Sequence, residues 1–433
     1  MTGLEVVGAA RQALVALLDA PGVGELFSAL DGNGEELRIV GGAVRNALMG
    51  LPVNEVDLAT TALPDEVTRR AALANFKTVP TGIEHGTVTV VVHGRPFEVT
   101  SLREDVETDG RRAVVRFGRS FTEDAQRRDF TINALSLGRD GVVHDEVGGL
   151  ADIAARRVRF IGDPERRIRE DYLRILRLFR FHASYAAGPI DADGYAAAMR
   201  LREGLRLLSA ERVRNELVKL LAAPGAAATT RDMLAGGFWP LLLGGVPHIG
   251  RLAGFMEWQG AGPGPAALLP DAPLPRLAAL AVLTREDAER LRRDLRLSNA
   301  QSLELSRIAG ALERLHGRSL PGEGLPEEGL PEDGGTIDPV LIRLVLDLGA
   351  PAVCAALALE ARAAPGLAAL QRRLHALPAF PLTGSNLLAR GLRPGPRIGR
   401  ILATARDAWA EAGCPLDKPS LEAILDRAMS ASA

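Results

Sequence analysis

Two glycines and two carboxylates lie close together near the N-terminus, in a combination that suits phosphate chemistry. Gly41 and Gly42 follow a short apolar run and precede a helical pattern. A phosphate can approach such a backbone closely, and the first N–H groups of the helix attract the same anion. Arg45 falls in the first turn of this helix, where we expect it to reach a triphosphate oxygen. Glu55 and Asp57 are two residues apart, so on a strand both would point to one face.

This arrangement favours a metal-dependent transfer reaction. Carboxylate oxygens are the ligands that hard divalent cations prefer, and the sequence therefore predicts Mg²⁺ at Glu55 and Asp57. Two such ions can activate an attacking hydroxyl and stabilise a departing pyrophosphate. Taken separately, the glycines indicate an ordinary turn and the acids an ordinary surface. Their closeness in the chain favours the nucleotide site.

A second polar group lies in residues 127–134, which read Arg-Arg-Asp-Phe-Thr-Ile-Asn-Ala. Adjacent arginines and an acid could form a solvated face. The apolar residues Phe130 and Ile132 nevertheless bury the other side of the segment and fix the polar set. Upstream, Glu98 lies on a predicted strand, where it is either a third carboxylate of the site or one partner of a structural ion pair.

The third group lies on a helix predicted over Glu170–Phe181. Asp171 and Arg174 are three residues apart and share a face, which Arg177 and Arg180 continue. A carboxylate only accepts hydrogen bonds and a guanidinium only donates them. Cytosine and adenine offer an amine beside an accepting ring nitrogen, whereas guanine and uracil present the opposite order. The pair should therefore accept C and A and reject G and U without a nucleic-acid template, although an intrahelical ion pair is the alternative.

In this order, the three groups resemble the motifs of the class II tRNA nucleotidyltransferase and bacterial poly(A) polymerase family. The resemblance implies a polymerase-β-like catalytic head in which Arg128 contacts the incoming nucleotide and Asn133 lies near its sugar. It assigns base choice to the Glu-Asp-x-x-Arg motif that contains Asp171 and Arg174, with Arg177 and Arg180 reaching the triphosphate or the base. The family pattern has Asp-x-Asp where this chain has Glu55, whose longer side chain shifts the metal.

The elements that must position these groups are predicted as strands first and helices afterwards, which is typical of an α+β protein. The expected fold is a nucleotidyltransferase head with a mixed sheet, followed by an all-α neck, body and tail. The predicted head elements are a helix over 4–20, a strand over 37–40, a helix over 43–49, and a hairpin of strands 87–92 and 96–102 with Gly94 and Arg95 between them. Segments 131–137 and 142–143 could extend the sheet.

Composition shifts divide the chain into five predicted parts: head 1–150, neck 151–221 with the base-selecting helix, body 222–321, linker 322–335 and tail 336–433. The linker consists mainly of Gly, Pro and acids. Residues 103–119 resemble the flexible loop of the family, and Ser209 is expected to cap a helix. In the tail, Gly395–Arg400 either presents a helix start and two arginines to an RNA phosphate or forms a simple turn.

The bulk composition limits the partners. The net charge of −2 excludes general attraction to nucleic acid, so binding must come from local patches. Residues 156–181 are such a patch, with nine arginines and four acids. Cys354 and Cys414 lack metal-ligand spacing and are expected to be reduced thiols. No apolar run is long enough to span a bilayer and no signal peptide is evident, so we expect a cytoplasmic protein without membrane contact.

These observations predict an enzyme that adds CCA: it would transfer CMP and AMP from CTP and ATP to the 3′ end of tRNA and release pyrophosphate. The nearest alternatives are a poly(A) polymerase or an enzyme that adds only part of CCA, because these share the three motifs. An alternative from another class is a non-catalytic RNA-binding protein with a site weakened by Glu55. The sequence leaves the oligomeric state and the exchange of CTP for ATP open.

Overall fold

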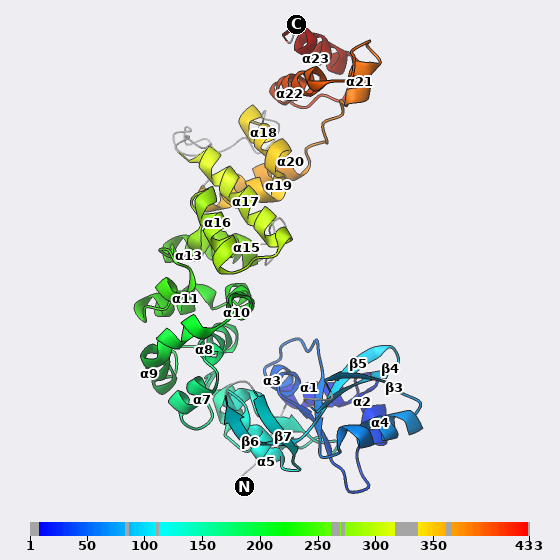
Figure 1. The fold of residues 1–433 in the computed structure, drawn as a ribbon, viewed down its shortest axis with the longest axis vertical. Helices are drawn as coiled ribbons and strands as arrows, with labels where there is room; N and C mark the ends of the chain where they lie inside the picture. Colours follow the sequence, from blue (N-terminus) through cyan, green and yellow to red (C-terminus); the bar gives the residue numbers. More distant parts are fainter. Residues whose placement is uncertain are drawn as a thin grey trace. The chain divides into compact units, whose positions relative to one another are not determined.

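A computed structural model describes residues 8–82, 86–109, 112–260, 269, 273–316, 337–360 and 366–431. Contacts between residues divide the chain into two compact units, Met1–Leu208 and Ser209–Ala433 (Figure 1). The predicted linker 322–335 and the first residues of the predicted helix 4–20 lie outside the described residues. The finer division into five parts stays a prediction.

A mixed seven-stranded sheet forms the centre of the N-terminal unit, in the order β3-β4-β5-β2-β1-β8-β9. Only the β2–β5 pair is parallel; the other pairs in this sheet are antiparallel. The strands are β1 (Leu37–Val40), β2 (Asp57–Thr60), β3 (Lys77–Gly82), β4 (Thr87–Val92), β5 (Arg95–Ser101), β8 (Ser136–Leu137) and β9 (Val143–His144). The expected α+β fold with a mixed sheet is confirmed.

One face of this sheet packs in the main hydrophobic core, and the other holds acidic side chains beside a second, small apolar cluster. Ile39, Leu58 and Val99 lie side by side on three strands and are fully buried. They pack in one hydrophobic core with helices α1 (Ala9–Leu18), α2 (Val23–Leu30) and α4 (Pro64–Leu73). The neighbouring positions Asp57 and Glu98 therefore point to the opposite face.

Two predicted strand segments differ from the structure. Thr131–Asn133 forms a 3₁₀ turn, η2, and only Ser136–Leu137 of the segment 131–137 pairs with the sheet. The hairpin loop consists of His93 and Gly94, because Arg95 already pairs with Val92. Both loop residues have positive φ, 50° and 78°, as a two-residue type I′ turn requires.

The segment expected as a flexible loop forms a separate two-stranded sheet of β6 (Arg103–Asp109) and β7 (Arg112–Phe117). Gly110 and Arg111, at its turn, lie outside the described residues. The helices α3 (Gly42–Leu48), α5 (Phe121–Arg127) and α6 (Gly149–Ala154) complete the head part of this unit. Asp145 accepts hydrogen bonds from the backbone of residues 147–150 and so fixes the start of α6.

The predicted helix over 170–181 is interrupted. Helix α7 (Pro164–Glu170) ends before Asp171, and α8 (Leu173–Tyr185) begins after Tyr172. Helix α9 (Ala192–Leu201) and the 3₁₀ helix η3 (Arg202–Leu207) follow and complete the N-terminal unit.

The described residues of the C-terminal unit form helices and the loops that join them, and Ser209 caps α10 as predicted. Its helices are α10 (Ala210–Ala222), α11 (Ala226–Ala235), α12 (Trp239–Leu242), α13 (Ile249–Gly260), α15 (Pro273–Ala281), α16 (Arg285–Asp294), α17 (Asn299–Leu315), α18 (Pro339–Leu348), α19 (Ala350–Glu360), α20 (Leu367–His375), α21 (Gly384–Leu388), α22 (Pro396–Glu411) and α23 (Lys418–Ala431). The two cysteines are buried and unpaired.

Aromatic residues divide unevenly between the units. All three tryptophans belong to the C-terminal unit, and all three tyrosines belong to the N-terminal unit. No single described helix is long and apolar enough to span a membrane; α1 and α2 pass that test of length and composition together, with a 64° bend between them.

Candidate active site

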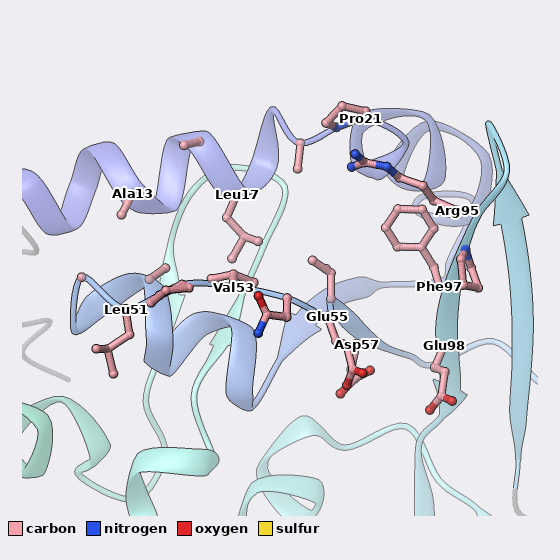
Figure 2. A pocket seen from close by; sticks show the side chains of 18 of the residues that line it. Ala13, Leu17, Pro21, Leu51, Val53, Glu55, Asp57, Arg95, Phe97 and Glu98 are labelled. Carbon is pink, nitrogen blue, oxygen red and sulfur yellow. The ribbon is translucent and has the colours of Figure 1, made fainter. Parts of the chain in front are cut away.

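The carboxylates of the first motif gather at one end of the sheet. Asp57 begins β2, and Glu98 lies directly opposite it on the parallel strand β5. Figure 2 shows both side chains on the side of the sheet away from Phe97 and Leu17. Glu55 precedes the strand in an extended segment, so the expectation that both acids lie on one strand is wrong in that detail.

The charges of these carboxylates affect one another. Burial raises the pKa of Asp57, and the neighbouring Glu98 and Glu55 raise it further, while Arg128 acts in the opposite direction. A cation placed among the acids would relieve this repulsion, so the donor set fits a hard divalent ion. Among the described residues, no three His, Cys, Asp or Glu side chains lie close enough to share one ion. As its side chain lies here, Glu98 does not complete a three-carboxylate site.

A cavity of about 1240 Å³ opens beside the carboxylates (Figure 2). Helix α1, the segment that leads to β2 and the start of β5 line it. Its walls combine the acids with apolar side chains, among them Leu17, Val53 and Phe97. Glu55, Asp57 and Glu98 are exposed, and the carboxylates of Asp57 and Glu98 point away from these apolar walls, so a ligand reaches them from the other face of the sheet.

Gly41 provides space for an arginine. A Cβ at this position would lie 2.8 Å from Arg128 Nη1, and the φ of +69° is one that side chains rarely adopt. At Gly42 a Cβ would make only an ordinary contact with Arg45. Because α3 has seven residues, few peptide dipoles add up at its start. The structure thus supports the need for glycine at position 41, and the phosphate contact of both glycines stays a prediction.

Arg128 belongs to the second motif and lies next to Gly41. Its Nε donates to Asp124 Oδ2 at 2.9 Å, and its Nη1 donates to the carbonyl of Asn133 at 3.2 Å. Its charge also reaches Asp57, whose pKa it lowers. Arg128 is therefore close to the carboxylates, as the predicted nucleotide contact requires.

Arg45 has a different position from the one expected. It is buried and donates to Asn133 Oδ1 and, at 2.9 Å, to the hydroxyl of Tyr185. Its guanidinium also stacks on Tyr185, 4.0 Å from the ring centroid. Burial lowers the pKa of Arg45. In this structure Arg45 links α3 to η2 and α8, and its contact with a triphosphate oxygen stays a prediction.

Asp129 joins the second motif to the third. Its Oδ1 accepts from Asn133 Nδ2 at 3.0 Å and from the backbone N–H of Phe130 at 2.9 Å. Its Oδ2 accepts from Arg177 Nε at 2.6 Å. Burial alone would raise the pKa of Asp129, but Arg177 and Asn133 outweigh it, and the pKa is lowered. The buried carboxylate therefore stays charged at neutral pH.

The hydrogen bonds from Arg45 through Asn133 and Asp129 to Arg177 connect all three motifs. Sequence reasoning placed Arg45, Asn133 and Arg177 at the site but gave Asp129 no role. It also missed Tyr185. Asp129 pairs with Arg177 and Tyr185 pairs with Arg45, and both partners lie far away in the chain, so no local pattern could have indicated these two contacts.

Asp171 and Arg174, the pair predicted to select the base, lie at the interruption between α7 and α8. Asp171 Oδ1 accepts from the backbone N–H of Leu173 at 3.0 Å, which fixes the start of α8. Arg174 donates to Glu170 and, at 2.8 Å, to the carbonyl of Arg167. Asp171 and Arg174 remain one turn apart, since the Arg174 N–H donates to the carbonyl of Asp171 at 3.0 Å.

Arg167 is a further residue that the sequence did not indicate. It is buried, pairs with Glu170, and donates to the carbonyls of Arg127 and Arg128. It thereby holds α7 against the second motif. Arg180, farther along α8, stacks on Phe181 at 4.1 Å from the ring centroid.

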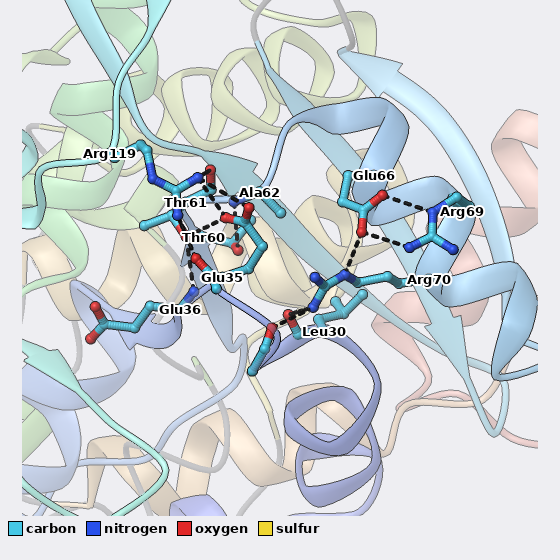
Figure 3. Close-up of polar contacts among 12 residues, drawn as sticks. Leu30, Glu35, Glu36, Thr60, Thr61, Ala62, Glu66, Arg69, Arg70 and Arg119 are labelled. Atoms are coloured by element: carbon cyan, nitrogen blue, oxygen red, sulfur yellow. Dashed lines mark hydrogen bonds and ion pairs between the residues drawn. The ribbon is translucent and has the colours of Figure 1, made fainter.

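The end of the β6–β7 hairpin is attached to the head by a polar cluster (Figure 3). Arg119 donates to Glu35 at 3.0 Å, and Thr61 Oγ1 donates to the same carboxylate at 2.6 Å. The N–H of Gly118 also donates to the carbonyl of Leu102 at 2.9 Å. The predicted loop thus starts and ends at a fixed place on the sheet.

This chain is similar to several known proteins. The Poly A polymerase head domain family matches residues 37–159. CCA tRNA nucleotidyltransferase 1, mitochondrial, of Danio rerio is 34% identical over 412 residues, 94% of this chain and 90% of that protein. A CCA-adding enzyme of Levilactobacillus brevis is 44% identical over 209 residues, 48% of this chain and 51% of that one. The structure of the Bacillus stearothermophilus CCA-adding enzyme in complex with CTP superposes with a TM-score of 0.70 at 27% identity, covering 98% of this chain and 99% of that one.

Proposed function

This chain belongs to the family of CCA-adding tRNA nucleotidyltransferases, and we propose that it transfers CMP and AMP from CTP and ATP to the 3′ end of tRNA. Similarity to a CCA tRNA nucleotidyltransferase over 94% of the chain is the observation that carries this proposal. The hydrogen-bonded connection among the three motifs supports it. The cytoplasmic location stays a prediction, since the Danio rerio relative is named as mitochondrial.

Enzymes of this family generally use divalent metal ions, and we propose Mg²⁺ at Glu55 and Asp57. The raised pKa of Asp57, caused by burial and by the two other acids, supports a cation there. When bound, such ions promote attack by a hydroxyl and neutralise charge on the triphosphate. Glu55 lies outside the β2 ladder, so the pairing of that strand does not fix its backbone, and we propose that its longer side chain still supplies an oxygen ligand.

The side chains of this protein hold the reactants in line. We propose that Arg128, whose charge acts on Asp57 and whose guanidinium fits beside Gly41, binds the triphosphate of the nucleotide. The 3′ oxygen of the tRNA attacks the α-phosphorus, and the bond between that phosphorus and the bridging oxygen of the β-phosphate breaks. Pyrophosphate leaves with that oxygen, and the hydroxyl proton passes to water. We propose that Asn133, whose side chain is fixed by Arg45 and Asp129, contacts the sugar.

Base choice is assigned to Asp171 and Arg174. Glu170 and the carbonyl of Arg167 orient the guanidinium of Arg174, so its donors face a fixed direction. A carboxylate beside them accepts from the exocyclic amine of C or A. Each such bidentate match discriminates by about 1–3 kcal/mol. We propose that Arg177 and Arg180 contribute positive charge along the same helix.

Nucleotide incorporation into tRNA transcripts that lack CCA tests this function. We expect CTP alone to add two C residues, CTP with ATP to complete CCA, and GTP and UTP to add nothing. Incorporation of ATP alone into long tails would instead identify a poly(A) polymerase, and a product that stops at CC or needs prior CC would identify a partial enzyme.

Two variants separate the enzyme from a protein that only binds RNA. Asp57→Asn removes a proposed metal ligand and should reduce transfer at least about 10³-fold, with unchanged circular dichroism. Glu55→Asp restores the pattern of the family and should keep or raise activity. If neither the natural chain nor Glu55→Asp incorporates nucleotide with Mg²⁺ or Mn²⁺, the RNA-binding alternative is correct.

A further inference from the structure

The interruption between α7 and α8 has an unusual packing contact. Tyr172 occupies this interruption, between Asp171 and the first residue of α8. A Cβ at Gly204 would lie only 2.0 Å from Tyr172 Cδ1, 2.1 Å from Cε1 and 2.5 Å from Cγ. The tyrosine ring therefore lies directly against the backbone of η3, in the space that any other residue at position 204 would fill.

Backbone conformation does not explain the glycine. Gly204 does not belong to the positive-φ glycines, and it is buried in the middle of η3. An alanine would fit the local backbone and would be favoured by helix propensity. The tyrosine ring is thus the feature of this structure that requires glycine at this position.

The contact connects η3 to the proposed base-selecting pair. The carbonyl of Tyr172 accepts from the N–H of Ile175 at 3.2 Å, and the carbonyl of Asp171 accepts from the N–H of Arg174 at 3.0 Å. A displacement of the ring would therefore move the first turn of α8. The guanidinium of Arg174 is held by α7, through Glu170 and Arg167, so such a movement would change the spacing between Asp171 and Arg174.

We propose that Tyr172 and Gly204 are positioning residues that set how strictly the site selects C and A. This inference rests on the proposed function, because the selectivity it concerns is that of nucleotide transfer to tRNA. Neither residue needs to touch the substrate. Their packing fixes the interruption that sets the spacing between Asp171 and the first turn of α8, which carries Arg174.

The test compares the ratio of CMP to UMP incorporation, as kcat/KM, in four variants and the natural enzyme. Gly204→Ala should lower the ratio about tenfold, since one misplaced bidentate contact costs that much discrimination. Tyr172→Ala should lower it as well, and Tyr172→Phe should keep the natural ratio because the ring remains. The double variant Tyr172→Ala with Gly204→Ala should match Tyr172→Ala, because the methyl group then meets no ring.

Gly24→Ala is the matched control, since a Cβ there meets no atom within 4 Å, and its ratio should be natural. The KM for tRNA should be unchanged in all variants. The ratio of two kcat/KM values does not depend on the fraction of folded enzyme, so a general loss of folding cannot produce the expected change. If Tyr172→Ala keeps the ratio within about twofold of the natural enzyme, the inference is wrong, whether or not Gly204→Ala folds. A natural enzyme that incorporates UMP as well as CMP would overturn the proposed base selection and this inference with it.

Discussion

Replacing Asp129 with asparagine tests whether the second motif holds the base-selecting helix in place. Asp129 accepts two hydrogen bonds on Oδ1 and an ion pair from Arg177 on Oδ2. Asparagine has the same shape, but one side of its amide donates. In either orientation of the amide, an NH₂ group would face N–H donors, from Arg177 or from Phe130 and Asn133.

The size of the effect follows from these contacts. A hydrogen bond to a buried charge contributes about 1.5–3 kcal/mol. The Arg177 side chain is 31% exposed, so water replaces part of the lost interaction, and we expect a loss near the lower end, about 2 kcal/mol. Local opening of α8 would then become about 30-fold more frequent.

Hydrogen–deuterium exchange of the α8 amides measures this opening directly. In Asp129→Asn, peptides from Leu173–Tyr185 should exchange about 30-fold faster, and the CMP to UMP ratio should fall. Glu165→Gln is the control: it removes ion pairs to Arg169 and Arg200 on the surface of the same unit, where such pairs contribute at most about 1 kcal/mol. An α8 exchange rate within about threefold of the natural protein would refute the idea that Asp129 holds α8.

Three further variants test the site and its support. Glu98→Gln should lower the pKa of Asp57, because burial and Glu98 raise it. The acid limb of the plot of kcat/KM against pH should then move to lower pH. If the limb does not move, the charge of Glu98 does not act on Asp57. In Asp152, burial alone would raise the pKa, but hydrogen bonds outweigh it and the pKa is lowered. Asp152 therefore stabilises the fold at pH values above the pKa that it has in the unfolded chain. This stabilisation is lost as the pH falls through the pKa that Asp152 has in the folded protein. Asp152→Asn should cost about 1–3 kcal/mol at pH 7 and much less in acid, as urea titrations at both pH values would show. Gly41→Ala should displace Arg128 and raise the KM for CTP about tenfold, and an unchanged KM would rule out that role for the glycine.

Local patterns were sufficient for the elements that hold the first motif. The strands Leu37–Val40 and Thr87–Val92 have the predicted bounds, because β-branched and apolar residues alternate there between two glycine-containing turns. The helix after Gly41 was also predicted. Base selection by Asp171 and Arg174 was expected from their spacing on one helix, and they remain one turn apart.

What the sequence did not indicate depends on contacts between distant residues. Arg45 lies 140 positions before its partner Tyr185, and Asp129 lies 48 positions before Arg177. Helical periodicity continues through Asp171 and Tyr172, and the interruption found there coincides with the packing of the tyrosine ring on the distant Gly204. No window of neighbouring residues contains this information.

The uneven division of aromatic residues gives each unit its own chromophore. Tryptophan fluorescence reports on the C-terminal unit, where Trp239 and Trp409 are fully buried, and tyrosine absorbance reports on the N-terminal unit. Denaturation of the natural chain, followed with both signals, would show whether the catalytic part melts together with the helical part or by itself. No label or added reporter is needed to make that distinction.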